Sequence, residues 1–111
     1  MAKTPEGKVK DRVVRILKDA GAYYFFPATH GFGRSGVPDV VACVNGQFLA
    51  IECKAGKNKP TALQVREIEA IRKSNGVAVV VNETNWDMLP ELIRKLKGGT
   101  SIMTSAGGDD A

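Results

Sequence analysis

The stretch Gly33–Lys54, GRSGVPDVVACVNGQFLAIECK, decides the fold of this 111-residue chain. Within it, two apolar runs flank the pair Asn45-Gly46. Asn-Gly between apolar runs is a strong short-range signal for a β-hairpin, because a type I′ turn needs positive φ at both central residues. The stretch therefore predicts two antiparallel strands joined by a two-residue turn.

A two-residue turn also sets the register of the hairpin. Val44 then lies opposite Gln47, and Asp39 lies directly opposite Glu52. Opposite residues share a face of the sheet, and Lys54 shares it too because it follows Glu52 by two positions. The open end of the hairpin is thus expected to gather two acids and a lysine, unless a bulge or a longer loop breaks the pairing.

Two carboxylates that face each other repel unless a positive charge lies between them. Asp39 and Glu52 can therefore be interpreted in two ways, as a divalent cation site or as a pair of solvated surface acids. The continuous apolar run Val40–Val44 favours the cation site, because such a run is typical of a strand that is covered on both faces.

Length and composition limit the class of protein. The chain is long enough for one domain, expected over residues 1–97, with a disordered tail over 98–111 that lacks periodicity. No apolar run is long enough to span a bilayer, and the N-terminus lacks a signal-peptide core, so we expect a cytoplasmic protein with no membrane partner.

The net charge of +4 and the pI of about 9.2 are compatible with a polyanionic partner. Cys43 and Cys53 fall on opposite faces of the predicted hairpin, so we expect two buried free thiols.

A first helix is expected over residues 4–20. Thr4 can cap it, Pro5 suits the first helical position, and Gly21 suits the stop. Glu6 lies on the apolar side of this helix and has two readings. It is either a charge that favours the helix N-terminus or an acid that reaches the same site as the hairpin acids.

An aromatic run over residues 22–27 predicts a strand that packs into the core, and a glycine-rich loop over 28–36 follows it. Such a loop can approach a phosphate through its backbone, or it can simply connect two strands. Arg34, beside Ser35, is the residue of this loop that we most expect to contact a phosphate. After the hairpin, Lys57 and Lys59 are expected to form a basic rim.

A second helix is expected to begin at Thr61, where Thr61-x-x-Gln64 is a capping-box pattern. Gln64 either completes this cap or points inward toward the open end of the hairpin. The apolar run 76–81 predicts a central strand reached by a crossover, and Asn85 is expected to cap a last helix that has Pro90 in its first turn.

The element order, with Glu6, Pro38-Asp39 and Glu52-Cys53-Lys54, resembles that of the PD-(D/E)XK nuclease superfamily. The motif reads P-D, twelve intervening residues, then E-C-K. Gly36-Val37 and Gln64 make the chain more narrowly similar to the stand-alone VRR-NUC (virus-type replication-repair nuclease) domains. The resemblance implies an α/β, restriction-endonuclease-like fold, with an αβββαβ core, a mixed sheet flanked by helices, and a C-terminal helix.

The resemblance also implies roles for individual residues. Asp39 and Glu52 resemble metal ligands, with the backbone carbonyl of Cys53 as the third protein ligand. Lys54 resembles the residue that orients or deprotonates the attacking water. Glu6 resembles a helix acid that acts on a second metal or its water.

Gln64 resembles a helix glutamine near the reacting phosphate. The implied cofactor is Mg²⁺ or Mn²⁺, and the implied partner is DNA, whose backbone is expected to contact Arg34, Ser35, Lys57 and Lys59. A phage gene is a source that this resemblance would fit.

One small domain carries one such site, so cutting both strands of a branched DNA needs a second copy. We therefore expect a homodimeric, metal-dependent, structure-selective DNA endonuclease of the type that resolves Holliday junctions. The alternatives are a nicking or restriction-like nuclease on duplex DNA and a non-catalytic nucleic-acid-binding module.

Overall fold

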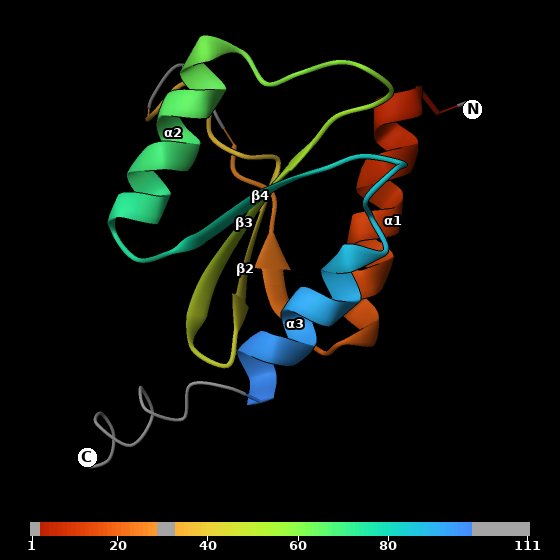
Figure 1. Ribbon diagram of the computed structural model, residues 1–111, viewed down its shortest axis with the longest axis vertical. Coiled ribbons are helices and arrows are strands. Elements are labelled where there is room, and N and C mark those ends of the chain that lie inside the picture. The colour runs from red at the N-terminus through yellow and green to blue at the C-terminus, as the bar shows by residue number, and fades with distance from the viewer. Residues whose placement is uncertain (1–2, 29–32, 99–111) are drawn as a thin grey trace.

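The computed structural model describes residues 3–28 and 33–98 of the chain. Its elements follow the order α1 (Pro5–Asp19), β1 (Tyr23–Phe25), β2 (Val40–Val44), β3 (Gln47–Cys53), α2 (Ala62–Lys73), β4 (Val77–Val81) and α3 (Met88–Gly98). One sheet holds the strands in the order β1-β2-β3-β4, with β3 and β4 parallel and the other pairs antiparallel. This mixed sheet with three helices confirms the predicted α/β architecture (Figure 1).

The β2–β3 hairpin has the predicted turn and register. Asn45 and Gly46 adopt φ values of 52° and 79°, as a two-residue turn with positive φ requires. The ladder runs from Val44↔Gln47 to Val40↔Ile51. The side-chain amide of Asn45 donates to the carbonyl groups of residues 96 and 97 at 3.1 and 3.3 Å, which holds the turn against the end of α3.

The helix ends follow from local chemistry, with one correction. The Thr4 hydroxyl accepts a hydrogen bond from the Gly7 N–H at 3.0 Å and caps α1 as predicted. Asn85 does not cap α3, because its side-chain oxygen accepts from the Asn82 N–H at 2.8 Å and closes the preceding turn. The helix therefore begins three residues later, at Met88.

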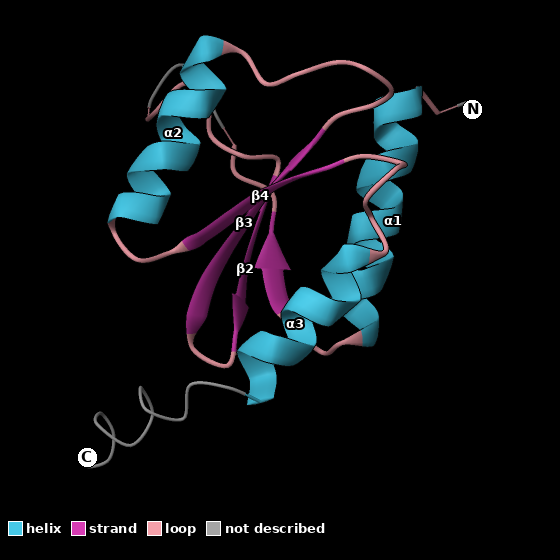
Figure 2. Cartoon of the chain, in the orientation of Figure 1, coloured by secondary structure: helices cyan, strands magenta, loops and turns pink. Residues whose placement is uncertain are grey.

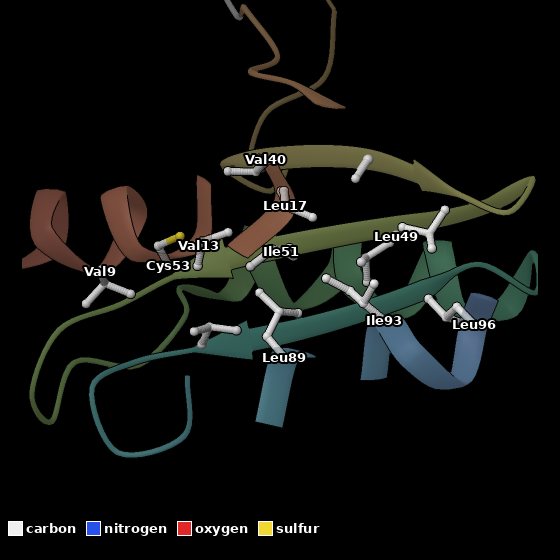
Figure 3. Packing of buried hydrophobic residues seen from close by; sticks show 13 residues of the cluster. Val9, Val13, Leu17, Val40, Leu49, Ile51, Cys53, Leu89, Ile93 and Leu96 are labelled. Carbon is white, nitrogen blue, oxygen red and sulfur yellow. The ribbon is translucent and has the colours of Figure 1, made fainter. Parts of the chain in front are cut away.

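The helices cover the two faces of the sheet unequally (Figure 2). On one face, α1 and α3 pack on the sheet around a large cluster that includes Leu17, Ile51 and Leu89 (Figure 3). On the other face, α2 contributes Ile68 to a small cluster with Ala50 and Ala78. The core therefore lies mainly on the α1/α3 side, and the α2 side is only partly covered.

The position of β4 differs from the prediction. β4 pairs only with β3 and lies at the edge of the sheet, not at its centre. Its apolar sequence reflects cover on both faces, because Val81 belongs to the large cluster and Ala78 to the small one. The crossover itself is as predicted, since α2 connects two parallel neighbours.

Two predictions of burial are wrong for the same reason. Tyr23 and Phe25 are 69 and 46% exposed, and Cys43 is exposed as well. Tyr23 lies beside Cys43 in the sheet, and Cys43 lies beside Phe48, which is 47% exposed. These side chains stand where α2 does not reach, and we call Tyr23, Phe25, Cys43 and Phe48 the open sheet face.

None of the helices within residues 3–28 and 33–98 has the length and apolar character of a membrane-spanning segment. The predicted tail lies outside the described residues, except for Gly98, which is the last residue of α3. Residues 29–32 of the predicted glycine-rich loop also lie outside them.

Candidate active site

Asp39 lies in the bend directly before β2, at the open end of the hairpin. Its carboxylate oxygen Oδ2 accepts a hydrogen bond from the backbone N–H of Cys53 at 2.9 Å. The last residue pair of the ladder is Val40↔Ile51, so this side-chain contact continues the pairing of the two strands past the regular ladder. Asp39 is thereby held beside the end of β3, as the register predicted.

Glu52 is the most unusual side chain of the sheet. It is 1% exposed, and neither of its carboxylate oxygens has a hydrogen-bond partner among the described residues. Its pKa is raised to about 7, chiefly by burial and then by the charge of Asp39, with a smaller contribution from Glu6. An unsatisfied buried carboxylate is costly, so a group that supplies positive charge at this point would stabilise it.

Lys54 supplies part of that charge. Its ammonium nitrogen lies 3.4 Å from Glu52 Oε2, and its side chain is 11% exposed. The charge of Lys54 opposes the rise in the Glu52 pKa without cancelling it. The Lys54 N–H donates to the Val81 carbonyl at 3.0 Å, which fixes the backbone of this residue at the edge of the site. The structure thus brings Asp39, Glu52 and Lys54 together.

Cys53 lies between these residues but points the other way. Its side chain is fully buried in the large cluster with Val13 and Ile51 (Figure 3). The pKa of its thiol is raised to about 12, chiefly by burial and then by the charges of Asp39 and Glu52. The thiol is therefore protonated at neutral pH and is no metal ligand, which leaves only the backbone of Cys53 for that role.

The donor set fits a hard divalent cation. Two carboxylates and a backbone carbonyl offer oxygen ligands, as Mg²⁺ and Mn²⁺ prefer. The two Glu52 oxygens accept no hydrogen bond in the described part of the chain, and their cationic neighbour there is Lys54, whose ammonium nitrogen lies 3.4 Å from Oε2. Within residues 3–28 and 33–98, no three side chains of His, Cys, Asp or Glu gather as a ligand group. Glu6 therefore does not complete a three-carboxylate site with Asp39 and Glu52.

Glu6 and Lys10 approach the site from α1. Glu6 is partly buried, and it acts on Glu52 and Cys53 only through its charge. Lys10, one turn further along, places its ammonium nitrogen 4.4 Å from the centre of the Phe26 ring, and its charge lowers the Cys53 pKa. The sequence carries one signal for the place of Lys10, because its spacing of four from Glu6 puts both residues on one side of the helix.

Gln64 completes the cap of α2. Its side-chain oxygen accepts from the Thr61 N–H at 2.8 Å, and its own N–H donates to the Thr61 hydroxyl at 3.2 Å. The capping-box reading is therefore the one that the structure shows. The cap uses the amide oxygen of Gln64 and not its NH₂ group.

The predicted DNA contacts have different surroundings. Ser35, Lys57 and Lys59 are exposed, the two lysines in the connection between β3 and α2 that arches across the end of the sheet (Figure 1). Arg34 instead forms a two-point ion pair with Glu67, with N···O distances of 2.8 and 2.9 Å. Nothing in the sequence pointed to this pair, because its partners lie 33 residues apart.

A mixed sheet in an αβββαβ order, with acids and a lysine at the open end of a hairpin, is typical of restriction-endonuclease-like nucleases. Residues 2–99 match the family model described as archaeal Holliday junction resolvase (Hjc). The chain belongs to this family, which lies within the restriction-endonuclease-like nuclease superfamily.

A phage protein is also similar. The chain is 44% identical over 59 residues to "Putative nuclease p44" of Acyrthosiphon pisum secondary endosymbiont phage 1. The match covers 52% of this chain and 60% of the phage protein. The chain thus spans less than two thirds of the length of that relative.

Proposed function

We propose that this protein is a metal-dependent, structure-selective DNA endonuclease that resolves four-way junctions. The observation that carries the proposal is the buried Glu52 carboxylate, which has no hydrogen-bond partner in the described residues and faces Asp39 and Lys54. Membership of a junction-resolvase family supports the choice of substrate. The smaller phage relative carries the name of a nuclease, which agrees with this class of reaction.

Asp39, Glu52 and the Cys53 carbonyl would hold Mg²⁺ or Mn²⁺. A bound ion of this kind neutralises charge on the phosphoryl oxygens and lowers the pKa of a bound water. Asp39 is oriented for this role by the Cys53 N–H. Glu6 would act from α1 on the water of a second ion, which is consistent with its purely electrostatic influence on Glu52.

Lys54 would orient the attacking water as an ammonium group, or accept its proton as a neutral amine. Its ammonium group is largely buried and lies against Glu52, so it has little freedom to move away from the site. The NH₂ group of Gln64, which the helix cap leaves unused, would donate to the reacting phosphate. Lys57, Lys59 and Ser35 would contact the DNA backbone and give salt-dependent binding without sequence preference.

We also propose that two copies act together. Cutting both strands of a junction needs two sites, and twofold symmetry is the commonest arrangement of homodimers. The open sheet face supports this proposal, because two of its aromatic side chains, Phe25 and Phe48, border a groove of about 580 Å³ on the α2 side. A light-scattering mass close to twice 11.9 kDa is expected at micromolar concentration, and a monomer mass would contradict the dimer.

The same proposal extends to the subfamily of the protein, the residues that carry the activity, and the origin and pathway of the protein. Gly36-Val37, Pro38-Asp39 and Gln64 favour kinship with the stand-alone VRR-NUC domains within the nuclease superfamily. We propose that residues 1–97 hold the whole activity. A phage origin and a role in DNA repair would agree with the phage relative and with the family.

The test is cleavage of a labelled panel of four-way junction, flap, splayed and linear DNA with Mg²⁺ or Mn²⁺. The wild-type protein should cut the junction fastest, and Asp39→Ala and Lys54→Ala should not cut it. The matched controls Asp19→Ala and Lys95→Ala change exposed residues away from the site and should cut normally.

Other outcomes select the other functions. Equal cleavage of linear duplex would favour a nicking or restriction-like enzyme. Junction binding without cleavage in either metal would favour a non-catalytic binding module. Unchanged cleavage by Asp39→Ala and Lys54→Ala would show that the site lies elsewhere.

A further inference from the structure

The segment 33–39 carries Asp39 and is anchored to α2 by an ion pair. Arg34 Nε and Nη2 donate to the two carboxylate oxygens of Glu67 at 2.8 and 2.9 Å. The Glu67 side chain is 6% exposed, whereas that of Arg34 is 69% exposed. A guanidinium that binds a carboxylate at two points is fixed in orientation as well as in distance, and a single-point contact would not fix both.

Gly36 forms a second and independent contact with α2. Its φ of +77° lies in the left-handed region, and a Cβ built there would come within 2.7 Å of the Leu63 carbonyl group. The loop backbone therefore lies directly against the first turn of the helix. Gly33, in the same segment, also has a positive φ of +92° but has no atom within 4 Å of such a Cβ.

The other end of the segment reaches the sheet. Asp39 accepts from the Cys53 N–H, and the intervening Pro38 is buried and restricts the backbone on both sides of its peptide bond. Only four residues separate Arg34 from Asp39, so this short segment links α2 to the end of β3. A displacement at Arg34 or Gly36 is therefore expected to reach Asp39.

We propose that Arg34 and Glu67 are positioning residues, which hold the segment 33–39 on α2 and so fix the Asp39 carboxylate in the site. The inference rests on the proposed function for its consequence in metal binding, but its geometry can be tested without metal. It assigns Arg34 a role different from the phosphate contact that its sequence position suggested. Glu67 keeps Arg34 in place, and the DNA backbone does not need to touch either residue.

The first test uses the metal-free protein and the exchange rate of the Cys53 amide, measured by NMR. This amide donates to Asp39, so it reports directly on the position of that carboxylate. In Glu67→Gln and Arg34→Ala, we expect its exchange to accelerate by about tenfold relative to the Leu49 amide, which serves as the control in the same strand. Equal acceleration of both amides would indicate general loosening and would overturn the inference.

The second test measures Mn²⁺ binding by calorimetry and junction binding without cleavage. Either variant should weaken Mn²⁺ binding by about tenfold, as loss of an indirect partner of a metal ligand does. The double variant should be no weaker than the weaker single variant, because both changes remove one interaction. Junction affinity in the absence of divalent metal should stay at the wild-type value.

Gly36→Ala and Gly33→Ala form a matched pair for the same question. Both substitutions place a side chain at a positive φ, but only the one at Gly36 pushes against α2. Gly36→Ala should accelerate Cys53 exchange and weaken Mn²⁺ binding, and Gly33→Ala should do neither. If Gly36→Ala fails to fold, Cys53 exchange and Mn²⁺ binding in Glu67→Gln, compared with the wild-type protein, still test the inference.

Two results would overturn the inference. One is normal Mn²⁺ binding in both Arg34→Ala and Glu67→Gln. The other is weaker junction binding in Arg34→Ala alone, which would make Arg34 a phosphate contact. A failure of the proposed function is distinguished from a failure of this inference by Asp39→Ala, which would then bind Mn²⁺ as tightly as the wild-type protein.

Discussion

Two glutamates are buried among the described residues, and they are in opposite situations. Glu67 on α2 has a guanidinium partner at two points, which lowers its pKa, with the hydrogen bond to Arg34 as the largest cause. Glu52 on β3 has two unsatisfied oxygens and a raised pKa. The difference separates two uses of a buried carboxylate. Glu67 is satisfied within the chain, whereas the carboxylate of Glu52 has the Lys54 ammonium as its cationic neighbour and, under the proposed function, would also bind a metal ion.

The comparison also bears on the proposed metal site at this end of the sheet. Lys54 compensates Glu52 incompletely, since its nitrogen is 3.4 Å away and the Glu52 pKa remains high. An arginine in place of Lys54 would bind both oxygens of Glu52, as Arg34 does for Glu67, and would leave no oxygen free for a metal ion. The incomplete compensation is thus a condition for the proposed chemistry and not a defect of packing.

The largest expected effect is on cleavage. Glu52→Gln keeps the shape of the side chain but removes a charged ligand, so cleavage of a four-way junction should fall by about 10³-fold or more, or roughly 4 kcal/mol in the transition state. Glu67→Gln acts only through Arg34 and should reduce cleavage by about tenfold. Single-turnover rates at one fixed Mg²⁺ concentration, near the dissociation constant of the wild-type protein, measure both. Equal losses in the two variants would remove the distinction between the two glutamates.

The sequence predicted one half of this comparison and not the other. Glu52 was placed beside Asp39 because the Asn45-Gly46 turn sets the hairpin register, and a register is a local property of a few residues. Glu67 was not predicted to pair with Arg34, because that contact depends on how α2 crosses the sheet. No local pattern encodes the crossing of a helix over distant loop residues.

The same reasoning explains the errors of burial and position. Aromatic and apolar runs predict that a strand is covered, but they do not say how far a helix extends over it. Tyr23 and Cys43 are exposed because α2 stops short of β1, and β4 is apolar at the edge of the sheet because two clusters cover it. For Gln64 the sequence allowed two interpretations, a helix cap or a side chain that points toward the open end of the hairpin, and the structure shows the cap.

The second prediction concerns the pH dependence of stability in the presence of a chelator. The pKa of Glu52 is about 7 in the folded state, above its ordinary value of 4.5, so the folded state binds the proton more tightly. The contribution of Glu52 to the free energy of unfolding is most favourable below pH 4.5. It declines as the pH rises to 7, by about 3 kcal/mol in total. Glu67, with a lowered pKa, loses its contribution only as the pH falls below its ordinary range.

Urea unfolding at pH 5 and pH 8 checks this expectation. The wild-type protein should be less stable at pH 8, and Glu52→Gln should be more stable than the wild-type protein at that pH and nearly independent of pH over this range. The Glu67→Gln variant should keep the wild-type dependence between pH 5 and 8. A wild-type stability that does not change over this range would contradict the raised pKa of Glu52.

The third prediction is that metal stabilises the fold through Glu52 and not through Glu67. Mg²⁺ at 100 times its dissociation constant should stabilise the wild-type protein by about 2.7 kcal/mol. At the same concentration, Glu67→Gln should gain about 1.4 kcal/mol if its affinity is tenfold weaker, and Glu52→Gln should gain almost nothing. Unfolding curves with and without Mg²⁺ give the three values. A full gain in Glu52→Gln would place the ion outside the proposed site.

The smallest expected effect separates the two roles of Gln64, which lies one turn before Glu67 on α2. Gln64→Ala removes half of the capping box and should cost about 1 kcal/mol of stability. Gln64→Glu keeps the cap, because glutamate at this position accepts the same Thr61 N–H, but it replaces the NH₂ group by a negative charge. If the NH₂ group donates to the reacting phosphate, Gln64→Glu should cut junctions at least tenfold more slowly than the wild-type protein at unchanged stability. Normal cleavage by Gln64→Glu would restrict Gln64 to the helix cap and leave the site to Asp39, Glu52 and Lys54.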